Sequence, residues 1–200
     1  MRGAADAGRR GNVASTLARY IVPVQIPDPL SQLSDDRIRR FAAYWIGKCA
    51  DGRIPNRTDI DPTEIPWALP FIWICDFLAE GPDFRYRLAG EHINDAFRQS
   101  LRGKTMRAIV SPELQEIAIR KYARVIEMPA ALHNFGPVYM HRGRSLVGER
   151  IVLPLSSGGG DMDMIIGVTL SQLNPVLDGS VDGNRWVDND YIPLDRFLPR

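Results

Sequence analysis

The amino-acid sequence predicts an α+β domain: a five-stranded antiparallel sheet with helices on one face, preceded by an amphipathic helix. Three observations support this class. Strand-like segments fall in two groups, residues 71–88 and 130–170. Turn residues within each group are placed for antiparallel hairpins. Between the groups, residues 90–128 show helical spacing punctuated by glycine and proline.

The first predicted element is a helix over residues 34–49, with Ser34 as its N-cap. Apolar residues recur at helical spacing and form one stripe. They are Ile38, Phe41, Ala42, Trp45, Ile46 and Cys49. The stripe must pack either on the outer face of the chain's own sheet or across a dimer two-fold. Ile38, Phe41 and Trp45 are therefore candidate interface residues of a homodimer.

Three acids follow in a proline-rich stretch, Asp59, Asp61 and Glu64. They could form a metal or acid–base cluster. The favoured interpretation is structural, because Asp61, Pro62 and Glu64 have the spacing of a helix capping box. No histidine or lysine lies nearby in the sequence to complete a catalytic site.

A hairpin is predicted next, with strands over residues 71–77 and 84–88 joined by turn residues. Alternation places Phe84, Tyr86 and Leu88 on one face of the second strand, and its two arginines on the other. Short helical segments are expected over residues 90–105, and a longer helix from Ser111 to Met128 with proline at its first position. Its predicted buried face comprises Leu114, Ile117, Ala118, Tyr122 and Val125.

Three further strands are predicted over residues 130–140, 145–155 and 162–170. Gly136 and Pro137 predict a bulge or an edge position in the first of them. One face of the second carries Val147, Glu149, Ile151, Leu153 and Leu155, and one face of the third carries Met162, Met164, Ile166, Val168 and Leu170. The domain is expected over residues 34–172, between a disordered tail (1–30) and a polar, acidic tail (174–200).

Composition narrows the function classes. The formal net charge is +1 and there is no long basic run, so nucleic acid is not an expected partner. No segment reaches the roughly 18 apolar residues that span a bilayer, and no membrane association is expected. The two cysteines, Cys49 and Cys75, lie in apolar stretches, which favours buried thiols in a reducing cytoplasm over a disulfide.

Four sequence words carry a family resemblance: FAAYWIGKCADGRIPNRTDIDPTEIPWALPFIWICD, DFRYRLAGEHI, LRGKT and GERIVLPLSSGGGDMDMIIGV. In this order they resemble a bacterial PAS-fold family, the fifth PAS group, over about residues 34–172. The resemblance implies a sensory fold, and a cytoplasmic location is expected. It does not by itself imply a ligand.

No cofactor is expected from motifs. The three histidines, His92, His133 and His141, have no metal-ligand spacing on one helix, so no metal is expected. His92 lies where some PAS domains bind cofactors, but an ordinary surface or capping role is the favoured interpretation. The reactive-cysteine word of flavin-binding, light-sensing PAS relatives does not occur in this sequence.

A ligand cavity between the sheet and the helices is one of two open interpretations of the apolar residues, and a filled core is the default. The candidate lining residues are Tyr86, Leu88, Phe97, Met106, Tyr122, Met164 and Ile166. Arg87 and Glu149 lie within apolar strands, where a buried charge must be paired. We expect ion pairs with Asp76 or with each other, in preference to contacts with a polar ligand.

These observations predict a stand-alone sensory or regulatory module that binds a small molecule or reports its state to an unidentified signalling protein. The alternative is an interaction or scaffold domain with a filled core and no ligand. An enzyme is not expected, because no nucleophile–base set or phosphate-binding motif can be defended from the sequence.

Overall fold

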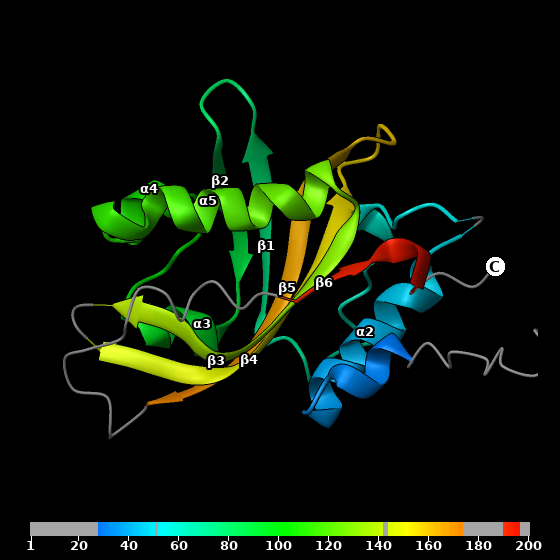
Figure 1. Cartoon of the computed structure of the whole chain (residues 1–200), viewed down its shortest axis with the longest axis horizontal. Helices are drawn as coiled ribbons and strands as arrows, with labels where there is room; N and C mark the ends of the chain where they lie inside the picture. Colours follow the sequence, from blue (N-terminus) through cyan, green and yellow to red (C-terminus); the bar gives the residue numbers. More distant parts are fainter. Residues whose placement is uncertain (1–27, 51, 142–143, 174–189, 197–200) are drawn as a thin grey trace, which may run out of the picture.

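A computed structural model describes residues 28–50, 52–141, 144–173 and 190–196. The predicted disordered tail lies almost wholly outside these residues. The described chain forms one antiparallel sheet with helices on both faces (Figure 1). The strands are β1 (Ile72–Leu78), β2 (Asp83–Ala89), β3 (Ala130–His141), β4 (Arg144–Ser156), β5 (Met162–Leu173) and β6 (Asp190–Pro193). The helices are α2 (Asp36–Lys48), α3 (Glu91–Phe97), α4 (Met106–Ile109) and α5 (Pro112–Glu127), with 3-10 turns at Pro29–Gln32, Arg57–Asp59 and Leu194–Arg196.

The sheet has six strands in the order β2-β1-β5-β4-β3-β6, so the expectation of five strands is wrong. The sixth strand, β6, lies in the segment predicted to be a polar tail. It pairs with β3 from Ala130↔Pro193 to His133↔Asp190. Only Ile192 of its four residues is buried, so the sequence shows too short an apolar pattern to mark a strand.

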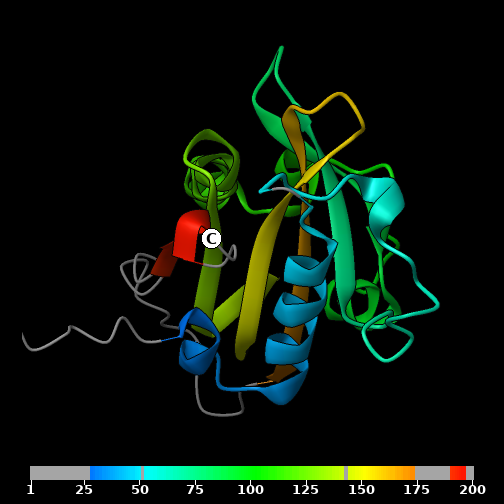
Figure 2. The same cartoon turned by 90° about the vertical axis from the view of Figure 1, so that its right-hand side faces the viewer.

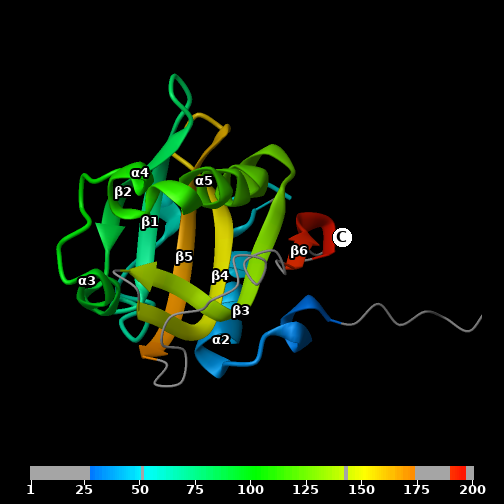
Figure 3. The same ribbon diagram turned by 60° about the vertical axis from the view of Figure 1, so that its left-hand side comes forward.

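Helices α3, α4 and α5 pack on one face of the sheet, and α2 packs on the other (Figure 3). The α5 boundaries confirm the predicted helix, with Ser111 as N-cap and Pro112 at the first position. Its buried face is rotated from the prediction, because Ile117 is 39% exposed while Ile119 and Lys121 are buried. Lys121, a residue type that is usually exposed, therefore lies on the side of α5 that packs on the sheet.

The apolar stripe of α2 covers the chain's own sheet, lying along β4 and β5 (Figure 2). Ile38, Phe41 and Trp45 are each 0% exposed in the single chain. The indole Nε1 of Trp45 donates to the Pro154 carbonyl of β4 at 3.1 Å. The assignment of these residues to a dimer interface is therefore wrong, because the sheet already removes them from solvent.

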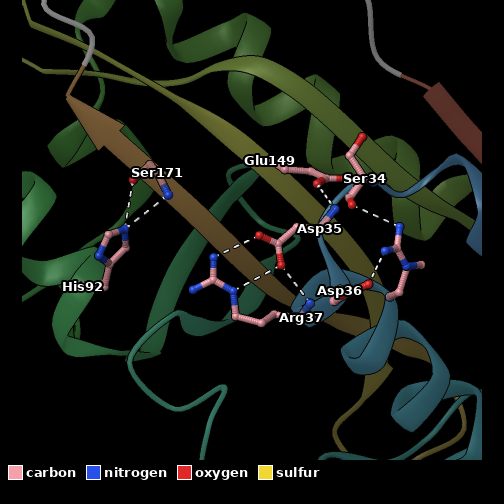
Figure 4. A network of polar contacts seen from close by, with 8 residues as sticks. Ser34, Asp35, Asp36, Arg37, His92, Glu149 and Ser171 are labelled. Atoms are coloured by element: carbon pink, nitrogen blue, oxygen red, sulfur yellow. Dashed lines mark hydrogen bonds and ion pairs between the residues drawn. The ribbon is translucent and has the colours of Figure 1, made fainter.

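A buried carboxylate holds the start of α2 (Figure 4). Glu149, 4% exposed, accepts hydrogen bonds from the backbone N–H groups of Ser34 and Asp35, both at 2.7 Å. The N-cap is Asp35, whose side chain accepts from the Arg37 N–H, and not Ser34 as predicted. Backbone N–H groups at the start of a helix have no carbonyl acceptor within the helix. Glu149 of β4 accepts from two such groups and so joins α2 to β4.

The acids between α2 and β1 have structural roles. The capping box is formed by Asn56 and Asp59, not by Asp61 and Glu64. Asp61 accepts from the backbone and hydroxyl of Thr63 within a turn, and Glu64 pairs with Lys48 at 2.5 Å. In the described part of the chain no group of three His, Cys, Asp or Glu side chains is arranged to bind a metal.

Gly90, the glycine of the second sequence word, lies between β2 and α3 and is required by a close backbone approach. A Cβ at this position would lie 2.2 Å from the Leu69 carbonyl oxygen and 2.4 Å from that of Pro70. The segment before β1 therefore packs directly on the start of α3.

Substitution Trp45→Ala is expected to lower the free energy of unfolding by about 3–5 kcal/mol, because it removes a fully buried ring and its hydrogen bond. Denaturant unfolding measures the change. Ala43→Ser, on the exposed side of the same helix, should change it by no more than about 0.5 kcal/mol. A near-neutral result for Trp45→Ala would show that α2 is not packed on the sheet.

Glu149→Ala is expected to cost about 3–5 kcal/mol, because it leaves two backbone donors and buried His133 without their partner. It should also speed hydrogen exchange of the Ser34 and Asp35 amides at the start of α2. The matched control is Glu64→Ala, an exposed acid that pairs at the other end of α2 and should cost at most about 1 kcal/mol. Equal effects of the two substitutions would contradict the anchoring role.

Candidate ligand-binding site

A cavity of about 50 Å³ lies between α5 and the sheet, on the face opposite α2. Its walls come from β2, α3, α4, α5, β3 and β4. The lining residues are Tyr86, Phe97, Met106, Ile109, Val110, Leu114, Ile117, Ala118, Lys121, Tyr122, Val138, Tyr139 and Arg150. Ile117 of α5 both lines the cavity and is partly exposed, so at this position α5 is the boundary between the cavity and solvent.

Arg150 of β4 is the most unusual residue of this cavity, because its guanidinium is buried with the residue only 1% exposed. Its Nε donates to the Thr169 hydroxyl at 2.9 Å. One terminal nitrogen donates to the Tyr122 hydroxyl at 2.5 Å and the other to the Val138 carbonyl at 2.6 Å. These bonds connect β4 to β5, α5 and β3 at one point.

Aromatic rings surround the same guanidinium. Its central carbon lies 4.4 Å from the ring centroid of Tyr139. The ring centroids of Trp73 and Tyr122 lie farther away, at 5.9 and 6.0 Å. The Trp73 indole also donates to the Thr169 hydroxyl, at 2.9 Å. Such rings present their negative faces to a cation, which partly replaces lost hydration.

The charge of Arg150 persists in this environment. Burial acts to lower the pKa of the guanidinium, but its interactions with Tyr122, Tyr139 and Tyr86 outweigh burial and the pKa is raised. No described carboxylate forms an ion pair with Arg150. The neighbouring Glu149 points to the opposite face of the sheet, where it holds α2.

A second cationic group, Lys121 of α5, lines the cavity and is 7% exposed. Burial, together with the positive charge of Arg150, lowers the pKa of its amine to about 6. The Lys121 carbonyl accepts a hydrogen bond from the Tyr191 hydroxyl of β6 at 2.9 Å. The strand that the sequence did not reveal therefore helps to position this part of α5.

Comparison with family models decides the identity of the fold. A PAS domain model, that of the fifth PAS group, matches residues 34–170. The chain belongs to this family. The match spans α2 through most of β5, and the sheet order of β2, β1, β5, β4 and β3 accompanies it. A comparison with curated proteins finds no match.

Solved structures similar to this PAS chain include light-oxygen-voltage domains. The dark structure of the blue-light photoreceptor Aureochrome1 LOV has 20% identity and a TM-score of 0.42, covering 60% of this chain and 88% of that one. A domain studied with a flavin analogue has 18% identity and a TM-score of 0.42, covering 55% and 82%. The Rhodobacter sphaeroides LOV protein has 11% identity and a TM-score of 0.40, covering 56% and 68%. At these scores no ligand is inferred from the similarity.

Four of the predicted ligand-binding residues of the PAS domain line the cavity, namely Tyr86, Phe97, Met106 and Tyr122. Met164 and Ile166 do not. The alternation predicted for β5 is correct, but these side chains pack against α2 on the other face of the sheet. Both faces of β5 are apolar, so periodicity could not show which face meets which helix.

Leu88 also lies away from the cavity, with 41% exposure. The pairing of β1 with β2 shifts register, so that Ile74 opposes Leu88 while Cys75 opposes Tyr86. Arg87 is the extra residue of this irregularity, and it turns Leu88 to the face that carries α2. A one-residue bulge thus ended the alternation that placed Leu88 beside Tyr86.

The expected ion pairs form in part. Arg87 pairs with Asp76, with Nε 2.8 Å from Oδ1, at a partly exposed position. Glu149 does not pair with Arg87, and instead lies 2.8 Å from Nε2 of buried His133. His92 contacts the Ser171 hydroxyl at 3.1 Å (Figure 4), which is an ordinary structural role. His141 lies where side chains are not described.

Three polar residues of the cavity were missed from the sequence: Lys121, Tyr139 and Arg150. Arg150 could have been found, because the alternation that puts Glu149 on one face of β4 puts Arg150 on the other. Lys121 is spaced for the same α5 face as the predicted Ala118 and Val125. The pattern was present, but charged residues are usually exposed, and neither residue was predicted to line a cavity.

The thiols of this PAS domain are free in the described structure. Burial raises the pKa of Cys49 to about 12 and that of fully buried Cys75 well above its usual value. Neither is a reactive thiolate near neutral pH. None of the described helices is long and apolar enough to cross a membrane.

Lys121→Met is expected to stabilise the domain, and more so as the pH falls from about 9 to about 6. The Lys121 amine has a lower pKa in the folded protein than in the unfolded chain, so between these two pKa values only the unfolded chain binds the proton. The stability of the native protein therefore decreases as the pH is lowered, until the folded amine is itself protonated. A gain of about 1 kcal/mol, or roughly 2–4 °C in melting temperature, is the minimum expected at pH 7.

Chemical unfolding at three pH values measures the effect. Arg120→Met, at an exposed position of the same helix, is the control and should show no such trend. A stabilisation of Lys121→Met that stays constant across this pH range would refute the assignment of a depressed amine pKa.

Proposed function

We propose that this chain is a sensory or regulatory PAS module that binds a small molecule in the cavity between α5 and the sheet and passes its state to a protein partner. Its family membership supports the signalling role. The observation that carries ligand binding is Arg150, a buried cation in the cavity wall with no acidic partner among the described residues. Buried charges are usually paired with an opposite charge, so a buried guanidinium without one favours a ligand.

The module acts without catalysis in this proposal. The lining of the cavity consists of apolar, tyrosine, lysine and arginine side chains and includes no carboxylate, cysteine, serine or histidine from the described chain. The usual nucleophile–base and acid–base pairs are therefore missing from the described lining. Binding and its mechanical consequence are the functions that this lining supports.

The outward face of α2 is the proposed contact for a partner protein. The apolar stripe of α2 is used by the sheet, so the contact involves the opposite, polar side of the helix, where Arg40 and Ala43 are exposed. The helix is joined to β4 through Glu149, and β4 also supplies Arg150 to the cavity. A cytoplasmic location accompanies this proposal.

Native mass spectrometry of the purified full chain, with thermal-shift measurements against a metabolite library, tests ligand binding. A co-purifying molecule, or a concentration-dependent rise in melting temperature of several degrees, is expected. Ala118→Leu, which fills the cavity from α5, should abolish the rise. Ala108→Leu, at an exposed position of α4, should retain it.

An unliganded protein that no compound stabilises would favour the alternative, a scaffold domain that works only through protein contacts. Stabilisation that survives Ala118→Leu would place the ligand elsewhere and overturn the cavity assignment.

A further inference from the structure

The described side chains that line the cavity include hydrogen-bond donors but, apart from a weakly accepting methionine sulfur, none that only accepts hydrogen bonds. Three of the five N–H groups of Arg150 have acceptors in Thr169, Tyr122 and Val138, and the Tyr139 hydroxyl also bonds the guanidinium. A tyrosine hydroxyl that accepts from a guanidinium keeps its own proton to donate. Donors therefore remain for a group that only accepts.

The positive charge in the cavity also favours a ligand that accepts hydrogen bonds. Arg150 is nearly inaccessible to solvent and forms no ion pair among the described residues. The cationic form of Lys121 is disfavoured by burial and, to a smaller extent, by the charge of Arg150. Burying a charge is costly unless an opposite charge or a full set of hydrogen bonds compensates it. An anion in this cavity would supply the opposite charge that Arg150 lacks among the described residues.

The remaining walls limit the size and character of such an anion. Met106, Ile109 and Val110 are apolar, and the volume of about 50 Å³ is far below the 300–1,000 Å³ typical of sites for drug-sized ligands. A guanidinium matches the planar, two-oxygen geometry of a carboxylate. The apolar walls suit a short hydrocarbon group better than a fully hydrated inorganic ion.

We propose that the cavity binds a small organic monoanion, with its carboxylate at Arg150 and the Tyr122 and Tyr139 hydroxyls and its short apolar part against Met106 and Ile109. This inference rests on the proposed ligand-binding function and names the ligand class. An inorganic oxyanion such as phosphate or sulfate also presents charged oxygen atoms, so the test must distinguish an inorganic oxyanion from an organic carboxylate.

The test is titration of the full chain with formate, acetate, propionate and butyrate at constant ionic strength, followed by calorimetry and thermal shift. Propionamide, of the same shape but neutral, and propylammonium, of opposite charge, are the ligand controls, and phosphate and sulfate are the inorganic arm. Saturable binding by one or more carboxylates, at least about tenfold tighter than the amide, is expected.

Variants locate the binding. Tyr122→Phe keeps the ring packing and removes one hydroxyl, and it should weaken carboxylate binding by about tenfold. Tyr44→Phe, whose hydroxyl bonds the Asp61 backbone on the α2 side, should leave the affinity unchanged. Arg150→Met should abolish binding. Tyr122→Phe and Tyr139→Phe carry the test if the arginine variant does not fold.

The possible results separate this inference from the proposed function. Binding of neutral molecules that Ala118→Leu abolishes, with no preference for carboxylates, would keep the sensory module and overturn the anion. Equal or tighter binding of phosphate or sulfate would overturn the organic carboxylate. Carboxylate binding that Tyr122→Phe and Tyr139→Phe leave unchanged would overturn the assigned site.

Discussion

A guanidinium withdrawn from water requires hydrogen-bond acceptors in place of water, and Arg150 has three of them on three different elements. A hydroxyl of β5, a hydroxyl of α5 and a carbonyl of β3 converge on one side chain of β4. Apolar burial holds these elements together but is not directional. Hydrogen bonds to a planar guanidinium are directional, so Arg150 helps to fix Tyr122 of α5 relative to β3, β4 and β5.

The residue that precedes Arg150 has the complementary role on the other face. Successive side chains of a strand point to opposite sides of the sheet, so a carboxylate and a guanidinium lie back to back at residues 149 and 150 of β4. The carboxylate receives the N-terminus of α2 and the guanidinium lines the cavity. Contacts on the two faces of the sheet are thus made by neighbouring residues of one strand.

Local chemistry explains which parts of the PAS fold could be predicted. The cap at Ser111, the proline after it and the hairpin at residues 78–83 identify their elements without tertiary information. Features that depend on packing between distant segments could not be predicted in this way. Met164 and Ile166 share a face as expected, but only the placement of α2 decides that this face is not the one with the cavity. The bulge at Arg87 and the short strand β6 likewise depend on their partner strands.

Some of the cavity residues could be predicted from local sequence patterns and others could not. Tyr86, Phe97, Met106 and Tyr122 follow from apolar patterning, because any residue on the inner faces of these elements must approach the others. Arg150 and Lys121 run against the usual association of charge with solvent. Their burial is a property of the assembled domain.

The bond between Tyr191 of β6 and the carbonyl of Lys121 connects segments 70 residues apart. Arg124, one turn further along α5, places its guanidinium 4.4 Å from the same tyrosine ring. The helix over the cavity is consequently secured by a part of the polypeptide that leaves the ribosome last among the described residues. Until residues 190–196 have been synthesised, neither the hydrogen bond to the Lys121 carbonyl nor the contact with the Arg124 guanidinium can form, so α5 receives these two contacts late in synthesis.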